Sequence, residues 1–266
     1  MRYVFFLLTL VLTHALALEV EVLDVNGTEA KVSIDQIDVG VSGFIVHKLA
    51  DDRHFIVNSA VVSAFDPKKK EATLKLSKYT LFTNNNLPTL KLTAQKGDTA
   101  VLAYAYGRGL LIAPQESIYY TLKGAMKNET FIHPDIFATM LSYRGHPTPL
   151  QEDFEDFCNN VTLGLLFFYI EQNLYTTDCH TFRILNIQKA PLKQSEEKLP
   201  FYSRVEKIEA NWFGKGSKRL EDYEPYYYEL LYRNNKDNKA LKEAILHSAD
   251  ANVSKLAHDL DLEDEQ

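Results

Sequence analysis

The sequence predicts an α+β protein with a small all-β barrel or sandwich at residues 18–108, a small α/β domain at 109–187, and a C-terminal helical tail. Up to residue 105, short segments in which apolar and polar residues alternate recur about every ten positions, as in small barrels and sandwiches. After residue 109, segments of helical periodicity alternate with short apolar runs, which is typical of an α/β unit. The 15 Tyr and 15 Phe residues also favour strands or a binding face over a helical bundle.

Composition and charge exclude several classes of protein. Apolar residues make up 45% and charged residues 24% of the 266, close to average globular usage, which excludes collagen, coiled coil and wholesale disorder. The 29 basic and 36 acidic residues give a net charge of −7. A phosphate backbone would repel such a chain, so we expect no nucleic-acid partner.

Residues 1–17 are predicted to be a signal peptide. Arg2 supplies a basic start, residues 3–13 form an apolar run, and Ala-Leu-Ala at 15–17 is a small-x-small cleavage signal. The run is too short to cross a bilayer as a helix, and no later segment is long enough either. We therefore expect export to the periplasm, the outer surface or the medium, without a transmembrane span; an uncleaved anchor is the alternative.

Strands account for the all-β part. Alternation on both sides of Asn26-Gly27 predicts a β-hairpin over residues 19–34 with a type I′ turn. Asp66-Pro67-Lys68 is predicted to be a turn, because Pro presets the turn dihedral angle and Asp caps it. Further strands are expected at 43–47, 54–65, 71–76, 87–93 and 99–105.

The α/β part is expected to begin near residues 107–109. It contains a buried strand at 110–113 and a helix at 115–126 with Ile118, Tyr119 and Leu122 on one face. A brief strand at 131–132 and a strand at 181–187 complete it. His133-Pro134-Asp135 is predicted to open a helix that runs through Leu141, because Pro at the first helical position costs little.

Cys158 and Cys179 are the only two cysteines, and we predict that they form a disulfide. Residues 161–170 and 174–177 are predicted to be two strands joined by a polar turn at 171–173, so the bond would close the open end of this hairpin. Two cysteines in an oxidising compartment most simply make one bond. The rival interpretation, a redox pair, lacks CxxC spacing.

Residues 188–266 are interpreted as a polar linker, packing segments and a helical tail. The linker is 188–199, and the aromatic segments 200–205 and 223–228 are expected to pack back on the domains. A single helix is predicted over 236–260, and the acidic residues 259–265 lie at the unfavourable end of its dipole, where it should fray. Its apolar stripe consists of Leu241, Ile245, Val253, Leu256 and Leu260.

The sequence contains no pattern that predicts catalysis, a cofactor or a metal site. His133-Pro134-Asp135 matches the J-domain tripeptide, but it stands between a strand and a helix rather than between two helices. Residues 214–217 lack the upstream glycine and strand of a phosphate loop. The adjacent carboxylates at 51–52 and 152–153 are predicted to be solvated turns. We therefore expect a non-enzymatic protein.

Several segments together resemble the N-terminal domain of the bacterial plasminogen-binding protein PgbA/PgbB family. The resemblance covers about residues 37–230, and the two cysteines with the hairpin between them belong to it. The segments that carry it are 39–49, 56–59, 87–89, 94–98, 111–114, 181–185 and 200–205.

This resemblance implies an exported or surface protein that is not an enzyme and has affinity for host plasminogen; a scaffolding component of a bacterial cell-envelope assembly is the alternative. Family members carry a Lys-rich tail ending in lysine, the kind of group that plasminogen kringles bind. The sequence here ends at Gln266 after an acidic run, so we expect binding to use an internal lysine. The best candidates are Lys68, Lys69 and Lys70 with the neighbouring carboxylate of Glu71; a solvated turn is the alternative.

Four N-x-S/T sequons are present, at Asn26, Asn128, Asn160 and Asn252. Asn26 and Asn252 also have an acid two positions upstream, which resembles the extended acceptor motif of bacterial N-glycosylation. These two are candidate glycosylation sites, although Asn26 is also explained by its turn.

Overall fold

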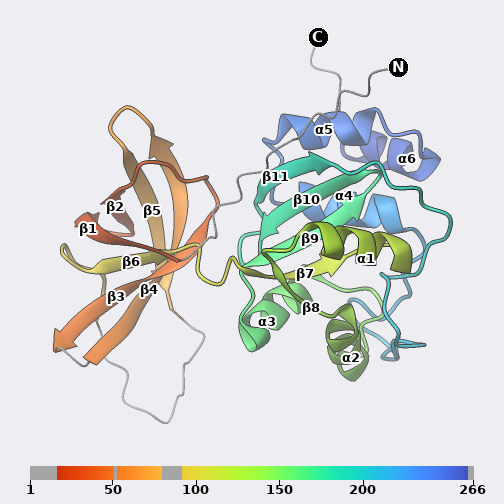
Figure 1. Ribbon diagram of the computed structural model, residues 1–266, viewed down its shortest axis with the longest axis horizontal. Helices are drawn as coiled ribbons and strands as arrows, with labels where there is room; N and C mark the ends of the chain where they lie inside the picture. Colours follow the sequence, from red (N-terminus) through yellow and green to blue (C-terminus); the bar gives the residue numbers. More distant parts are fainter. Residues whose placement is uncertain (1–16, 51–52, 80–91, 263–266) are drawn as a thin grey trace, which may run out of the picture.

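The computed structural model describes residues 17–50, 53–79 and 92–262. Nearly all of the predicted signal peptide, the carboxylates at 51–52 and most of the strand predicted at 87–93 lie outside these residues. Figure 1 shows a barrel beside a second sheet covered by helices. The predicted α+β class is therefore confirmed.

Six antiparallel strands form a closed barrel in the order β1-β2-β5-β4-β3-β6. Alternate residues of these strands fill its core, among them Val22, Val32, Ile45, Val62 and Leu74. Closure leaves no free sheet edge, which is how small barrels avoid edge-to-edge pairing. The strands are β1 (Leu18–Asn26), β2 (Glu29–Ser33), β3 (Ser42–Ala50), β4 (Arg53–Asp66), β5 (Glu71–Lys78) and β6 (Thr99–Leu102).

The first hairpin is present, but the predicted turn type is wrong. Asn26 pairs with Glu29, so the two central turn residues are Gly27 and Thr28. Of these only Gly27 has a positive φ, 60°, which is the pattern of a type II′ turn rather than type I′. The barrel decides the register, because this pairing points Ala30 into the core, and a slip of one residue would turn β2 inside out.

The second sheet has the order β11-β10-β9-β7-β8. β7 pairs in parallel with β8 and β9, whereas β9, β10 and β11 are antiparallel. Its strands are β7 (Arg108–Ile112), β8 (Thr130–Ile132), β9 (Leu165–Ile170), β10 (Asn173–Asp178) and β11 (Ile184–Lys189). The helices are α1 (Glu116–Ala125), α2 (Pro134–Arg144), α3 (Gln151–Val161), α4 (Tyr223–Tyr232), α5 (Lys239–Leu246) and α6 (Ala251–Asp259).

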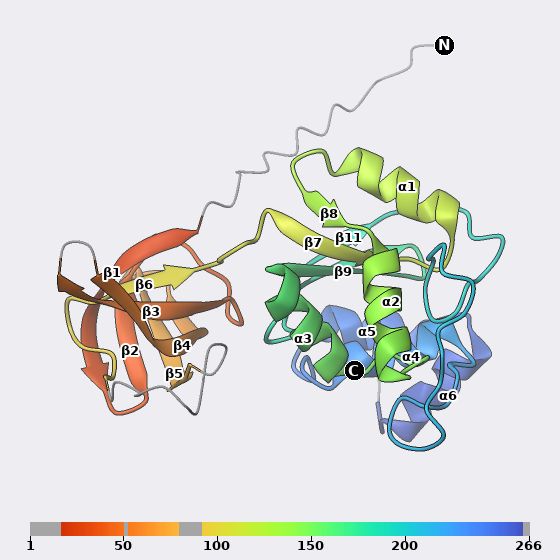
Figure 2. The same ribbon diagram turned by 90° about the horizontal axis from the view of Figure 1, so that it is seen from below.

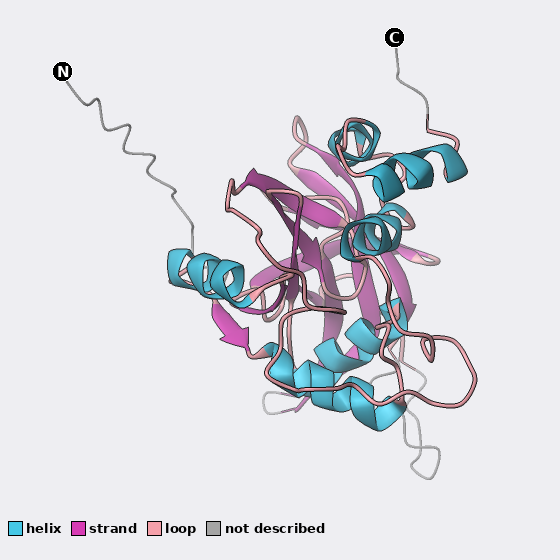
Figure 3. Cartoon of the chain, turned by 90° about the vertical axis from the view of Figure 1, so that its right-hand side faces the viewer, coloured by secondary structure: helices cyan, strands magenta, loops and turns pink. Residues whose placement is uncertain are grey.

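Helices cover both faces of this sheet (Figures 2 and 3). Successive β7 residues point to opposite faces: Leu111 packs in the core that contains α1, and Leu110 and Ile112 pack in the core that contains the other helices. The predicted buried face of α1 is confirmed. Such a sheet needs runs that are apolar at every position, and β9 is buried throughout.

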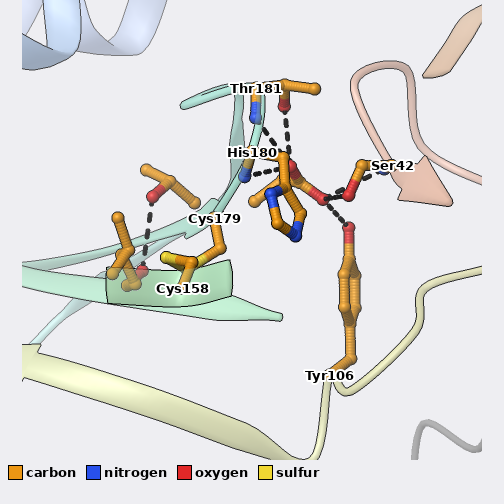
Figure 4. The surroundings of a disulfide bond; sticks show 9 residues. Ser42, Tyr106, Cys158, Cys179, His180 and Thr181 are labelled. Atoms are coloured by element: carbon orange, nitrogen blue, oxygen red, sulfur yellow. Dashed lines mark hydrogen bonds between the residues drawn. A yellow bond between two sulfur atoms is a disulfide. The ribbon is translucent and has the colours of Figure 1, made fainter. Parts of the chain in front are cut away.

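α3, which contains Cys158, is a helix that was not predicted. The predicted Cys158–Cys179 disulfide is present, but it ties this helix to the end of β10 instead of closing the hairpin at its open end (Figure 4). Asp153 was predicted to lie in a solvated turn, and this prediction is also wrong. Its side chain is buried and receives hydrogen bonds from Arg144 and the Leu150 backbone N–H, because it completes the N-terminal capping of α3.

The single helix predicted over 236–260 is two helices, α5 and α6. Asp250 explains the break, since its carboxylate accepts hydrogen bonds from the N–H groups of Asn252 and Val253 and so caps α6. The apolar positions Leu241, Ile245 and Val253 are nevertheless buried. The aromatic segments pack as expected, with Phe201 and Tyr227 fully buried.

A buried carboxylate joins the barrel to the second sheet (Figure 4). Asp178, at the end of β10, accepts hydrogen bonds through Oδ2 from the Ser42 N–H (3.0 Å), the Ser42 hydroxyl (2.6 Å) and the Tyr106 hydroxyl (2.7 Å). Through Oδ1 it accepts from the N–H groups of His180 and Thr181. Burial, with the neighbouring Asp178 charge, raises the pKa of Tyr106, so this phenol stays a donor.

The division into domains near residues 107–109 stays a prediction. β6 ends at Leu102 and β7 begins at Arg108, so the two sheets meet near that point. The barrel core and the α1 side of the second sheet, however, form one continuous apolar cluster that includes Ala100 and Leu111.

Candidate binding surfaces

The predicted lysine turn lies at the exposed end of the β4–β5 hairpin. Asp66 accepts hydrogen bonds from the backbone N–H groups of Lys68 (2.9 Å) and Lys69 (3.2 Å), which confirms the predicted turn. All three lysines are exposed, and Lys70 has a φ of 53°. The hairpin therefore presents three adjacent ammonium groups to solvent.

Most charges of this turn already have partners. The Lys70 ammonium lies 2.7 Å from Asp35, and Glu71 accepts from Lys31 at 2.9 Å. The hydrogen bond and charge of Asp35 raise the pKa of Lys70. Such exposed pairs contribute little stability, so a ligand carboxylate can displace them at small cost.

Lys68 differs from its neighbours. Lys69 lies 3.8 Å from Asp66, whereas the Lys68 ammonium has no carboxylate partner among the described residues. The four predicted binding residues, 68–71, lie together on this turn as expected, since they are consecutive in the sequence. It did not anticipate their pairs with Lys31 and Asp35, which are about 35 to 40 positions away.

A pocket of about 570 Å³ that the sequence did not reveal lies between the β9–β10 turn, β11, α4 and α5. Glu171 is held there by hydrogen bonds from the hydroxyls of Tyr228 (3.0 Å) and Ser248. Glu171 and Gln172 have φ values of 43° and 62°, a region unusual for residues other than glycine. Lys189 and His247 also line the pocket, so its lining includes both acidic and basic side chains.

Two neighbouring carboxylates, Glu197 and Glu224, lie where the linker meets α4. The pKa of Glu197 is raised to about 7, first by desolvation and then by the charge of Glu224 and a hydrogen bond with it. The folded chain then holds a proton that the unfolded chain releases near pH 4.5, so the contribution of Glu197 to stability falls as the pH rises from 4.5 to about 7.

Replacing Glu224 by Gln is expected to lower the pKa of Glu197 towards its ordinary value, because the neighbouring negative charge is removed. Carbon-13 NMR titration of the glutamate carboxyl groups measures the pKa of Glu197 in both chains. The Glu229→Gln variant, which changes an acid on the same helix, should leave the titration of Glu197 unaltered. A Glu197 midpoint that is the same in the Glu224→Gln variant as in the original chain would contradict the assignment.

The remaining motifs have structural roles or stay predictions. His133-Pro134-Asp135 opens α2 as predicted, and Asp135 pairs with Arg204 at 2.7 Å. Within the described ranges, no three His, Cys, Asp or Glu side chains are grouped to hold a metal ion. The candidate glycosylation sites are both exposed, Asn26 at the first hairpin and Asn252 in the first turn of α6. No described helix is long and apolar enough to cross a membrane.

The chain is similar in sequence to one described protein family. Residues 17–231 match the family model described as plasminogen-binding protein pgbA N-terminal. Two proteins named Plasminogen-binding protein PgbA, from Helicobacter pylori strains J99 / ATCC 700824 and ATCC 700392 / 26695, are each 29% identical to the chain over 221 residues. The match covers 81% of this chain and 47% of each relative, so the chain spans about half the length of these curated relatives. No solved structure matches it.

Proposed function

Because the chain belongs to the family of the plasminogen-binding protein PgbA N-terminal domain, we propose that it is an exported, non-enzymatic protein that binds plasminogen through surface lysines. The names of the relatives support a protein partner. The matched region includes the whole barrel and therefore the lysine turn. The observation that carries the proposal is this exposed run of three lysines, in which the Lys68 ammonium has no carboxylate partner among the described residues.

The chemistry of the turn supports this assignment. A kringle's lysine site takes an ammonium group with a carboxylate nearby, the pair that a C-terminal lysine supplies. Lys68 offers an accessible ammonium, and Asp66 and Glu71, which flank the three lysines in the sequence, offer carboxylates on the same turn. The overall negative charge does not forbid the contact, because screening confines charge effects to about 8 Å at physiological salt.

Replacing Lys68, Lys69 and Lys70 together by Ala is expected to abolish plasminogen binding. The affinity of the unaltered chain should be micromolar or weaker, and free lysine analogues should compete, because a single internal lysine offers few contacts. Surface plasmon resonance on immobilised plasminogen measures both effects. The single Lys68→Ala change should cost more affinity than Lys70→Ala, since Lys70 already has a partner.

A matched control removes the same charge elsewhere: Lys127, Lys193 and Lys255, which are exposed and lie outside the barrel, are replaced by Ala. This variant should bind as the original does. Tight binding that survives loss of the lysine turn and ignores lysine analogues would show that the site is elsewhere and of another kind.

Location tests the rest of the proposal. Cell fractionation combined with surface proteolysis distinguishes exposure at the outer surface from a periplasmic position. A protein confined to the periplasm cannot capture host plasminogen, and that result would favour the alternative role as a scaffold in the cell envelope.

A further inference from the structure

Aromatic side chains stand in solvent at one edge of the α/β part. Trp212, the only tryptophan of the chain, is 99% exposed and Phe213 is 87% exposed. Tyr143, near the end of α2, is 93% exposed. Single exposed apolar residues are ordinary, but adjacent Trp and Phe side chains that bury almost nothing indicate an interaction surface.

The loop that carries Trp212 and Phe213 is fastened at both ends to the segment that follows α2. On one side Asn211 donates to the carbonyl oxygens of Gly145 (2.9 Å, from its backbone N–H) and Arg144 (2.6 Å, from its side chain). On the other side Thr148 donates to the carbonyl oxygens of Gly216 (3.2 Å) and Lys218 (2.8 Å). The loop is therefore held at its base with its aromatic tip beside the end of α2.

The same loop is locally basic in an acidic protein. Residues 210–220 contain Lys215, Lys218 and Arg219 and no acidic residue, and the flanking carboxylates are Glu209 on one side and Glu221 and Asp222 on the other. All three side chains are exposed. In the part of the chain that the structure describes, none of them forms an ion pair with a carboxylate. The loop thus presents two large apolar side chains and three positive charges together.

We propose that this surface, Trp212 and Phe213 with Lys215, Lys218 and Arg219, docks the protein on a bilayer that contains anionic phospholipids. Trp and Phe side chains favour the boundary between headgroups and acyl chains, and Lys and Arg are attracted to anionic headgroups. Contact with a second copy through the same patch would bring like charges together at a two-fold interface. In Figure 2 the connection between β11 and α4 projects as a broad loop at the edge of the molecule. A projecting loop can insert its tip into the surface of a bilayer.

Because Trp212 is the only tryptophan, its fluorescence reports on the loop tip alone. With vesicles of phosphatidylglycerol and phosphatidylcholine in equal parts, the emission should shift to the blue and the protein should sediment with the vesicles. Vesicles of phosphatidylcholine alone should bind the protein at least about tenfold more weakly. High salt should weaken binding to the vesicles that contain phosphatidylglycerol.

Two variants complete the test. The first variant combines Trp212→Ala with Phe213→Ala and is read by sedimentation. The second combines Lys215→Gln, Lys218→Gln and Arg219→Gln and is read by sedimentation and fluorescence. Each variant should reduce vesicle binding about tenfold or more. The control Lys127→Gln, Lys189→Gln, Lys193→Gln should bind normally. Three results would overturn the proposal: no binding to anionic vesicles, binding unaffected by both variants, or a blue shift that follows protein concentration without lipid, which would indicate self-association.

Discussion

Replacing Asp178 by Ala is expected to lower the free energy of unfolding by about 3–5 kcal/mol. The change leaves five donors without their acceptor, from Ser42, Tyr106, His180 and Thr181. Those of Ser42 and Tyr106 are buried, where an unsatisfied donor costs about 1–3 kcal/mol. Urea denaturation followed by circular dichroism measures the loss.

Because Ser42 begins β3 of the barrel and Asp178 ends β10, the same variant should also weaken the coupling between the two sheets. The exposed pair of Arg183 and Asp237 supplies the control: Asp237→Asn removes a carboxylate that is 70% exposed and should cost less than about 1 kcal/mol. The Asp178→Asn variant, which keeps the shape and one acceptor, should fall between the two. A loss below about 1 kcal/mol for Asp178→Ala would show that water replaces the carboxylate without penalty.

Removing the disulfide by replacing both Cys158 and Cys179 with Ala is expected to cost about 3 kcal/mol. The bond joins residues 21 positions apart, so it restricts the unfolded chain, and it holds α3 against the end of β10. Both sulfur positions are buried, and Ala avoids placing a hydroxyl group there. Thermal and urea unfolding measure the change.

The unaltered chain under reducing conditions is the control, and it should lose nearly the same stability as the double variant. If reduction and substitution both leave the unfolding midpoint where it was, the bond constrains nothing and the prediction is wrong.

Local patterns were sufficient for much of the fold. In the barrel, β2 and β5 alternate between buried and more exposed residues. α1 carries Ile118, Tyr119 and Leu122 at helical spacing, and Pro134 marks the start of α2. In each of these segments the burial pattern repeats with the period of its own secondary structure, so neighbouring residues already indicate which side faces the core. The lysine turn was predictable from its own residues, because Pro67 presets the turn dihedral angle and Asp66 caps it.

Two of the missed elements had local signals. α3 carries Phe154, Phe157 and Cys158 at helical spacing, so the helix itself was readable from neighbouring residues. The hydrogen bonds of Asp153 with Arg144 and His146 came only with the fold. The α5–α6 break is also set locally, because Asp250 caps α6 through the N–H groups two and three residues further on and so competes with helix continuation. The pocket at Glu171 joins side chains from separate parts of the chain.

Local sequence was enough to predict the all-β and α/β character, the pairing of the two cysteines and the turn that carries Lys68. Each of these rests on residues close together or on the existence of one partner. The tertiary structure alone decided which residues occupy the first turn, that Asp178 meets Ser42 across 136 positions, and that Trp212 stands in solvent. The physical reason is that burial and hydrogen-bond satisfaction are properties of what surrounds a residue in space, and only the folded chain supplies those surroundings.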